Sequence, residues 1–272
     1  MSRIKYFLEQ NKMPIIIISI ILVCSIAIAI GVYAQITDTG TKVNNEEDDN
    51  YKDLKNNFKD IFTNSINKET TANLNYNYDD IIYCAYNIEE KVGNYIINAK
   101  LPLFKKESEV ISKVNQEIFD TFGRKILEII NNASVKTIYN LDYVAYVNGN
   151  IISLVIRCNY KDGTNPQRMI IQTYNYDIEN DKLLNIQDML EYKKLNKDEV
   201  QTKVIEEIKK INSQMKNINQ QSGYNVYVRN EQDSIYELEN TANYFLGKNN
   251  YLYLVYAYGN NNYTSETDLV IF

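Results

Sequence analysis

A long apolar run near the start of the chain decides where the rest of it can fold. From Ile15 to Val32 about 18 residues carry no charge, and Ser19 and Ser25 are the polar interruptions. As a helix this run would be about 27 Å long, close to the hydrocarbon thickness of a bilayer. We therefore predict a transmembrane helix over residues 14–34.

The charges on either side of the run predict its orientation. The segment before it holds three bases and one acid: Arg3, Lys5, Lys12 and Glu9. The segment after it reaches an acidic cluster at residues 46–49. Because positive charge is retained in the cytoplasm, we expect residues 1–13 to be a cytoplasmic stub and the remaining chain to lie outside the cell membrane.

The same run could instead be removed as a signal peptide. Val32-Tyr33-Ala34 places small residues where a signal peptidase reads, so cleavage between Ala34 and Gln35 would release a secreted protein. A signal-peptide core is usually about 7–15 residues long. The greater length of this run favours an uncleaved anchor, and secretion after cleavage is the alternative.

The expected exported part is acidic. Without residues 1–13 the chain keeps 26 bases and 34 acids, a net charge near −8. Such a surface repels nucleic acid, anionic lipid and anionic wall polymers, and it attracts a cationic partner. No nucleic-acid-binding motif is present, so we expect no nucleic-acid partner.

The pattern after the membrane run predicts an α+β fold. Residues 35–75 form a polar spacer with one short amphipathic helix beginning near Tyr51. The strands that we expect from β-branched and aromatic runs cover 81–88, 94–104, 141–147, 151–160, 168–178, 224–229, 243–258 and 268–272. Within these, Tyr251–Tyr258 is apolar on both faces and is expected to be a central strand. The dipeptide Asn148-Gly149 predicts a tight hairpin.

Two long amphipathic helices separate the strand groups. They are expected at 108–131 and 197–218. The apolar stripe of the first is Val110, Ile111, Val114, Ile118, Phe122, Ile126 and Ile129, and that of the second is Val200, Val204, Ile208, Ile211 and Met215. We predict antiparallel sheets with these helices packed on them, in two subdomains over 76–136 and 137–272.

The order of these parts resembles a known family. The stretches that carry the resemblance are INAKLPLF, KVNQEIF, NIISLVIRCNYKDG, TYNYDIENDKLLNIQDML and NYLYLVYAYG. Together, from Asn75 to Phe272, they are similar to the paired extracytoplasmic domains of unknown function found in lysozyme-sensing anti-sigma factors, and beside some peptidoglycan deacetylases, of Gram-positive bacteria. The resemblance implies a two-part ectodomain that binds a ligand such as lysozyme.

The chain departs from that family inside the cell. An anti-sigma factor needs a cytoplasmic domain that covers a sigma factor, whereas residues 1–13 would make hardly more than three helical turns. We expect no deacetylase domain after the ectodomain. The resemblance therefore implies a sensor or binding module, with a cationic protein or a cell-wall glycan as partner, and not a sigma-factor regulator. A secreted or wall-associated accessory protein is the alternative.

Composition argues against an enzyme. The chain contains no histidine, which removes Ser-His and Cys-His nucleophile pairs and the usual zinc sites. Two carboxylates could still hydrolyse a glycoside, and the adjacent acids at 79–80 and 89–90 are candidates, but such pairs are usually solvated. Asp177, Glu179 and Asp181 alternate like a calcium loop, yet Lys182 stands where that loop needs glycine. We expect no catalytic residue, no cofactor and no metal.

Cys84 and Cys158 are the cysteines of the expected exported part. An even number of thiols outside the cytoplasm permits a disulfide. Two buried thiols on separate strands explain the pattern equally well, and the sequence leaves both interpretations open. Cys24, within the apolar run, is interpreted as a buried side chain rather than a lipidation site.

Overall fold

The computed structural model describes residues 81–222, 227–258 and 266–272, all within one compact unit that spans Lys52–Phe272. The predicted cytoplasmic stub (1–13), transmembrane helix (14–34), cleavage site at Ala34–Gln35 and spacer (35–75) lie outside these residues. Within the described part of the chain, no helix is long and apolar enough to cross a bilayer.

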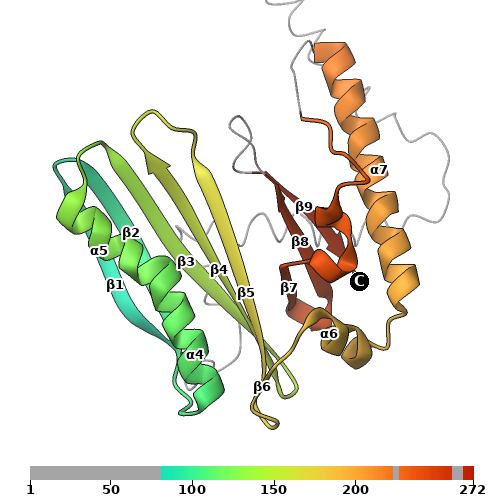
Figure 1. Cartoon of the computed structure of the whole chain (residues 1–272), viewed down its shortest axis with the longest axis horizontal. Coiled ribbons are helices and arrows are strands. Elements are labelled where there is room, and N and C mark those ends of the chain that lie inside the picture. Colours follow the sequence, from blue (N-terminus) through green and yellow to red (C-terminus); the bar gives the residue numbers. More distant parts are fainter. Residues whose placement is uncertain (1–80, 223–226, 259–265) are drawn as a thin grey trace, which may run out of the picture. The chain divides into compact units, whose positions relative to one another are not determined.

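The first half of this unit is a six-stranded sheet (Figure 1). Its strands, in spatial as well as chain order, are β1 (Ile82–Val92), β2 (Tyr95–Phe104), β3 (Thr137–Asn148), β4 (Ile151–Asp162), β5 (Arg168–Asp177) and β6 (Lys182–Leu183). Tight turns join β1 to β2 and β3 to β4, and each needs a glycine with positive φ: Gly93 at 48° and Gly149 at 62°. The predicted hairpin at Asn148-Gly149 is thereby confirmed.

The sheet is mixed, and the prediction of antiparallel sheets was wrong in this respect. β2 and β3 run parallel, whereas every other neighbouring pair in this sheet is antiparallel. The cause is the connection between β2 and β3, which is a helical crossover and returns the chain to the same end of the sheet. Strands from both predicted subdomains, 76–136 and 137–272, therefore share one sheet.

The crossover is one helical rod with a wide turn in its middle. It consists of α4 (Glu109–Ile118), the π-helical turn η2 (Phe119–Gly123) and α5 (Arg124–Asn132), and it lies across one face of the sheet (Figure 1). The Ser108 hydroxyl accepts a hydrogen bond from the Ile111 N–H at 3.1 Å and caps the start. This confirms the helix predicted at 108–131, but its π turn was not predicted.

The predicted apolar stripe faces the sheet. Its buried members are Ile111, Val114, Ile118, Phe122, Ile126 and Ile129. At the π turn, the hydroxyl of Tyr139 on β3 donates to the Phe122 carbonyl at 3.1 Å. A residue with Cβ at Gly123 would place that atom 2.6 Å from the Phe119 ring, so glycine permits this close packing.

The second half contains a smaller antiparallel sheet and its helices. The sheet order is β7 (Asn243–Leu246), β8 (Leu252–Tyr258), β9 (Glu266–Ile271), and the helices are α6 (Ile186–Lys193) and α7 (Lys197–Ser222). α7 confirms the helix predicted at 197–218, with Val200, Val204 and Ile208 in the core. β8 confirms the predicted central strand, since it lies between β7 and β9.

Several elements differ from the prediction. Residues 224–229 were expected to form a strand, but the described part, Tyr227–Arg229, is not a strand. The predicted run 243–258 is broken at Gly247 by the short 3₁₀ turn η5 (Lys248–Asn250), which separates β7 from β8. α6 and two further 3₁₀ turns, η3 (Ser234–Tyr236) and η4 (Leu238–Asn240), were not predicted.

Side chains of the large sheet form hydrogen bonds with the backbone at the outer edge of β7. The Tyr244 N–H donates to the Thr173 hydroxyl at 3.0 Å, and the Asn175 amide donates to the Tyr244 carbonyl at 2.7 Å. The Leu246 N–H donates to the Ser153 hydroxyl at 3.0 Å. These groups from β4 and β5 take the place of a neighbouring strand, so the backbone of β7 is paired on both sides.

An aromatic stack joins the two sheets beside this edge. Phe245 stacks on Tyr146 of β3, with ring centroids 5.7 Å apart, and on Tyr253 of β8 at 4.7 Å. The Tyr253 ring lies so close to Gly247 that a Cβ there would be 2.4 Å from its edge. Offset aromatic pairs add about 0.5–1.5 kcal/mol beyond area burial, so this stack is a strong contact between the sheets.

Candidate functional site

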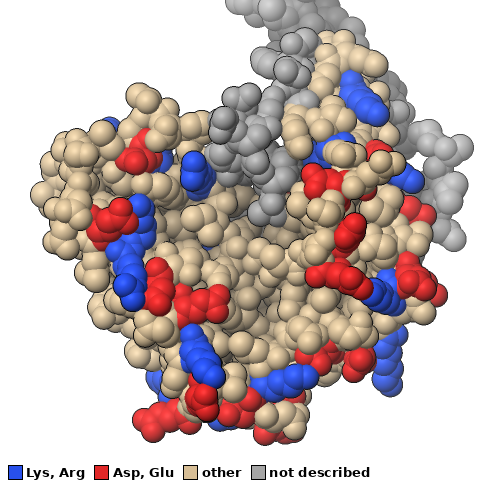
Figure 2. Space-filling model, in the orientation of Figure 1, with Lys and Arg blue, Asp and Glu red and all other residues tan. Residues whose placement is uncertain are grey.

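The stretch Asn230–Asn240, here called the acidic segment, concentrates negative charge at the surface. It contains Glu231, Asp233, Glu237 and Glu239 and no lysine or arginine. Glu237 and Glu239 are exposed, and Glu231 and Asp233 are partly exposed. In Figure 2, Asp and Glu side chains lie among Lys and Arg side chains over the region where Figure 1 draws α7 and the neighbouring 3₁₀ turns.

Apolar side chains of the segment point the other way. Tyr236 and Leu238, in η3 and η4, are 1% and 2% exposed and belong to the core under α7. The Asp233 carboxylate accepts a hydrogen bond from the Ile235 N–H at 3.2 Å and starts the first turn. The segment therefore buries alternate side chains and leaves its carboxylates at the surface.

Two amides of α7 hold the backbone of this region. Asn212 accepts from the Arg229 N–H at 2.8 Å and donates to the Arg229 carbonyl at 2.9 Å. On the same face of α7, about three turns nearer its N-terminus, Gln201 donates to the Tyr236 carbonyl at 3.0 Å and accepts from the Leu238 N–H at 2.7 Å. Each amide thus satisfies one backbone donor and one backbone acceptor, as a neighbouring strand would.

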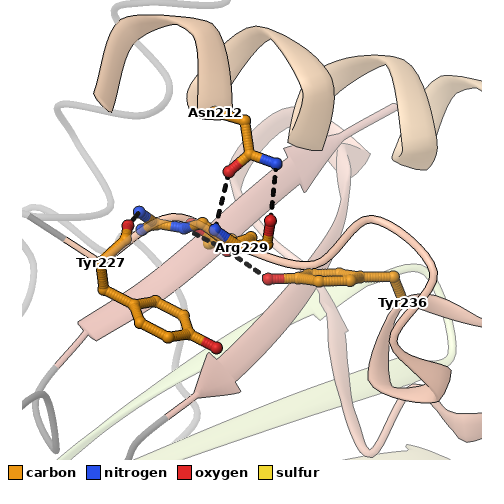
Figure 3. A network of polar contacts seen from close by, with 5 residues as sticks. Asn212, Tyr227, Arg229 and Tyr236 are labelled. Carbon is orange, nitrogen blue, oxygen red and sulfur yellow. Dashed lines mark hydrogen bonds and ion pairs between the residues drawn. The ribbon is translucent and has the colours of Figure 1, made fainter. Parts of the chain in front are cut away.

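A buried ion pair lies at the start of the segment. Figure 3 shows its arginine, Arg229, with Asn212, Tyr227 and Tyr236 around it. Arg229 and Asp268 have side chains that are 6% and 2% exposed, and their closest N–O distance is 2.9 Å. The Tyr236 hydroxyl donates to the same carboxylate at 2.9 Å, and Arg229 also donates to the Tyr227 carbonyl at 2.9 Å. Burial, and then the nearby Asp268 carboxylate, raises the pKa of Tyr236, which therefore remains a donor at neutral pH.

The outer end of the segment meets the start of α7. Lys197 forms an ion pair with Glu239, and the lysine hydrogen bond lowers the pKa of that carboxyl. Glu237 accepts a hydrogen bond from the Asn240 amide at 2.9 Å. The arrangement is an ordered strip of carboxylates on a fixed backbone. It can attract and orient a positively charged surface.

Of the two interpretations left open for Cys84 and Cys158, the disulfide is not present in this fold. Both thiols are free; Cys84 is exposed on β1, and Cys158 is buried on β4. β2 and β3 lie between these strands, so the two residues are at least about 14 Å apart at the usual strand spacing. Disulfides need Cα atoms within about 7 Å. The alternative of two buried thiols holds only for Cys158.

The other candidate residues are dispersed. Glu89 and Glu90 are exposed on β1, while residues 79 and 80 lie outside the described residues. Asp177 accepts hydrogen bonds from the backbone N–H groups of residues 179 and 180, both at 3.0 Å, as in an ordinary hairpin turn. Asp181 accepts from the Tyr176 hydroxyl. Over the described ranges, no three His, Cys, Asp or Glu side chains are grouped to hold a metal ion.

The acidic segment was not predicted from the sequence, although one signal was present. Residues 231–239 contain four acids and no base, interleaved with Ile235, Tyr236 and Leu238. That alternation indicates an ordered surface stretch rather than a solvated loop. The role of Asn212 and Gln201 carried no such signal, because it depends on which backbone segment folds against α7.

Comparison with known proteins gives a structural likeness and no assigned activity. No known protein family matches the sequence, and no curated protein matches it either. Among solved structures, the chain is similar to a DUF3298 family protein from Pseudomonas aeruginosa PAO1, with 13% identity, a TM-score of 0.40, and coverage of 65% of this chain and 80% of that one. It is also similar to a member of the same family from Bacteroides fragilis NCTC 9343, with 11% identity, a TM-score of 0.37 and the same coverage. The chain is thus structurally similar, at low identity, to domains of unknown function.

Proposed function

We propose that this chain is a membrane-tethered extracytoplasmic binding module that binds a cationic protein through its acidic segment. The observation that carries the proposal is the strip of carboxylates at Glu231, Asp233, Glu237 and Glu239, held on a backbone that α7 and the Arg229–Asp268 pair fix in place. Charge complementarity speeds encounter and selects partners. An ordered backbone reduces the entropy lost on binding.

The net charge of the expected exported part supports the same class of partner. A surface near −8 attracts basic proteins over a Debye length and repels anionic polymers. Lysozyme, the ligand implied by the resemblance described above, is the cationic probe of choice. The proposed role is binding and sensing rather than catalysis.

The test is binding of lysozyme to the full-length chain in detergent, measured by pull-down and titration at low and moderate salt. We expect micromolar binding that weakens as salt is added. The double variant Glu237→Gln/Glu239→Gln should bind roughly three- to tenfold more weakly, since each exposed charge pair contributes about 0.2–1 kcal/mol.

A matched control is available at the start of the crossover helix. Glu107 and Glu109 are exposed, and Glu109 pairs with Lys113 as Glu239 pairs with Lys197. Glu107→Gln/Glu109→Gln changes the net charge equally and should leave affinity unchanged. An equal loss of lysozyme affinity in both double variants would mean that overall charge, and not the acidic segment, determines binding, which would contradict the proposal. Absence of binding at micromolar concentrations would also contradict it.

The membrane topology of the chain is tested by a separate experiment. We propose a single-pass topology with residues 1–13 in the cytoplasm and the C-terminal part outside, because of the charge asymmetry around residues 14–34. Fractionation should recover the chain in the membrane at full mass, and a reporter fused to its C-terminus should be active outside the cytoplasm. A soluble mature chain beginning at Gln35 would instead indicate a secreted accessory protein.

A further inference from the structure

A small pocket lies where α5 ends and the chain enters β3. Figure 1 shows α5 against the six-stranded sheet. Its volume is about 190 Å³. Sites for drug-sized ligands begin at roughly 300 Å³, so this pocket has room for one small ring. It is built from the first sheet and its helix, and it shares no residue with the acidic segment.

Charged, hydroxyl and amide side chains line the pocket. Lys125 donates to Glu128 at 3.1 Å and places its ammonium group 5.0 Å from the centre of the Tyr160 ring. On the sheet side, the Thr137 hydroxyl donates to Asp162 at 3.3 Å. Asn132 and Ser134 complete the polar wall.

The charge of this lining restricts its ligand. Two carboxylates, Glu128 and Asp162, face one ammonium group, so an anion meets net repulsion. A cation would compete with Lys125. Burial disfavours the charged form of Lys125, but Glu128 and Tyr160 outweigh burial and raise its pKa, so the lysine stays charged in this place. Neither kind of ion fits as well as a neutral molecule.

The hydrogen-bonding groups suit a neutral polyhydroxyl ring. A hydroxyl both donates and accepts, and the pocket offers donors on Lys125 and Asn132 beside acceptors on Glu128 and Asp162. Tyr160 adds an aromatic wall for the apolar edge of a sugar ring. We propose that this pocket binds one neutral sugar residue, independently of the cationic-protein surface.

The test compares three sugars of one ring type that differ in charge. N-acetylglucosamine is neutral, glucosamine is cationic and N-acetylmuramic acid is anionic. Binding to the full-length chain, in a detergent without a sugar headgroup, is measured by saturation-transfer NMR. We expect millimolar affinity for the neutral sugar, the range for so small a ligand, and at least threefold weaker binding of both ions.

A pair of variants separates the pocket from general surface effects. Glu128→Gln removes a carboxylate acceptor, which is also the ion-pair partner of Lys125. It should weaken the binding of N-acetylglucosamine several-fold, and it should improve the binding of N-acetylmuramic acid relative to that of N-acetylglucosamine. Glu109→Gln removes an equivalent exposed partner, that of Lys113 on α4, and should change neither. Equal binding of the three sugars, no binding at tens of millimolar, or equal effects of both variants would overturn the proposal.

Discussion

At the scale of single residues, buried polar groups fix the chain path around α7. Arg229 and Asp268 lie on segments 39 residues apart, and three hydrogen bonds of 2.9 to 3.2 Å join their side chains. Tyr236 and Tyr227 add further hydrogen bonds to the pair. Such a pair contributes little net stability, but removing one partner leaves a buried charge uncompensated.

We expect Asp268→Asn to destabilise the protein by roughly 3–5 kcal/mol, because it strands the Arg229 guanidinium in the core. The double variant Arg229→Met/Asp268→Asn removes both charges and should lose less than the sum of its single variants. Urea denaturation of all four proteins measures this coupling. Strict additivity would contradict the account of a buried pair.

Gly247 provides a steric prediction. A methyl group there would stand 2.4 Å from the Tyr253 ring, which is 5% exposed and stacked on Phe245, so the ring has little room to move. We expect Gly247→Ala to destabilise by about 1–3 kcal/mol. In a Tyr253→Ala background the same change should cost almost nothing. A similar loss in both backgrounds would point to backbone strain instead.

At the scale of elements, the sequence predicted the features that depend on local apolar spacing. It did not predict those that depend on contacts between distant residues. The stripe from Ile111 to Ile129 predicted the crossover helix, since apolar spacing decides which face is buried. The π turn inside it depends on Tyr139, Phe119 and Gly123 fitting together, which no helical period shows. The parallel pairing of β2 with β3 likewise depends on where the crossover returns.

The expected strand at 224–229 illustrates the same limit. Its β-branched and aromatic residues favour a strand, but Asn212 occupies the backbone donor and acceptor of Arg229. For the candidate site, the sequence supplied the charge of the acidic segment. It could not supply the amides of α7 that order it, because helix-to-loop contacts have no periodic signature.

The saturated edge of β7 gives an element-level prediction. Thr173→Val removes the acceptor of the partly buried Tyr244 N–H, and we expect a loss towards the lower end of the roughly 1–3 kcal/mol that an unsatisfied buried donor costs. Thr202 is a matched control, since its hydroxyl donates to the Asp198 carbonyl on the exposed side of α7. Thr202→Val should shift the unfolding free energy by less than about 0.5 kcal/mol. Equal losses would show that the β7 contact is not buried.

At the scale of the whole molecule, the lack of histidine predicts a broad pH plateau. No side chain has an ordinary pKa between about 5 and 8. Hydrogen bonds from Arg124 and from Lys197 lower the pKa of Asp120 and Glu239, so the stability they add is present above about pH 4 and is lost as the pH falls further.

The alkaline limit follows from buried tyrosines. Burial raises the pKa of Tyr244, Tyr253 and Tyr256 to about 12 each. Their contribution is complete below their ordinary pKa of about 10 and is lost as the pH rises from there towards 12. Denaturant midpoints measured from pH 3 to 12 should therefore be level near neutrality and fall at both ends. A marked slope between pH 6 and 8 would contradict this.

The edge of β7 also bears on how the protein would fail. Its outward N–H and C=O groups are occupied by Thr173, Asn175 and Ser153 rather than by a strand. If those side chains were lost, the freed groups would form a template for another copy of the chain. We then expect the protein to self-associate by pairing of β7 with a strand of another copy. Light scattering should rise with protein concentration before the helical content falls.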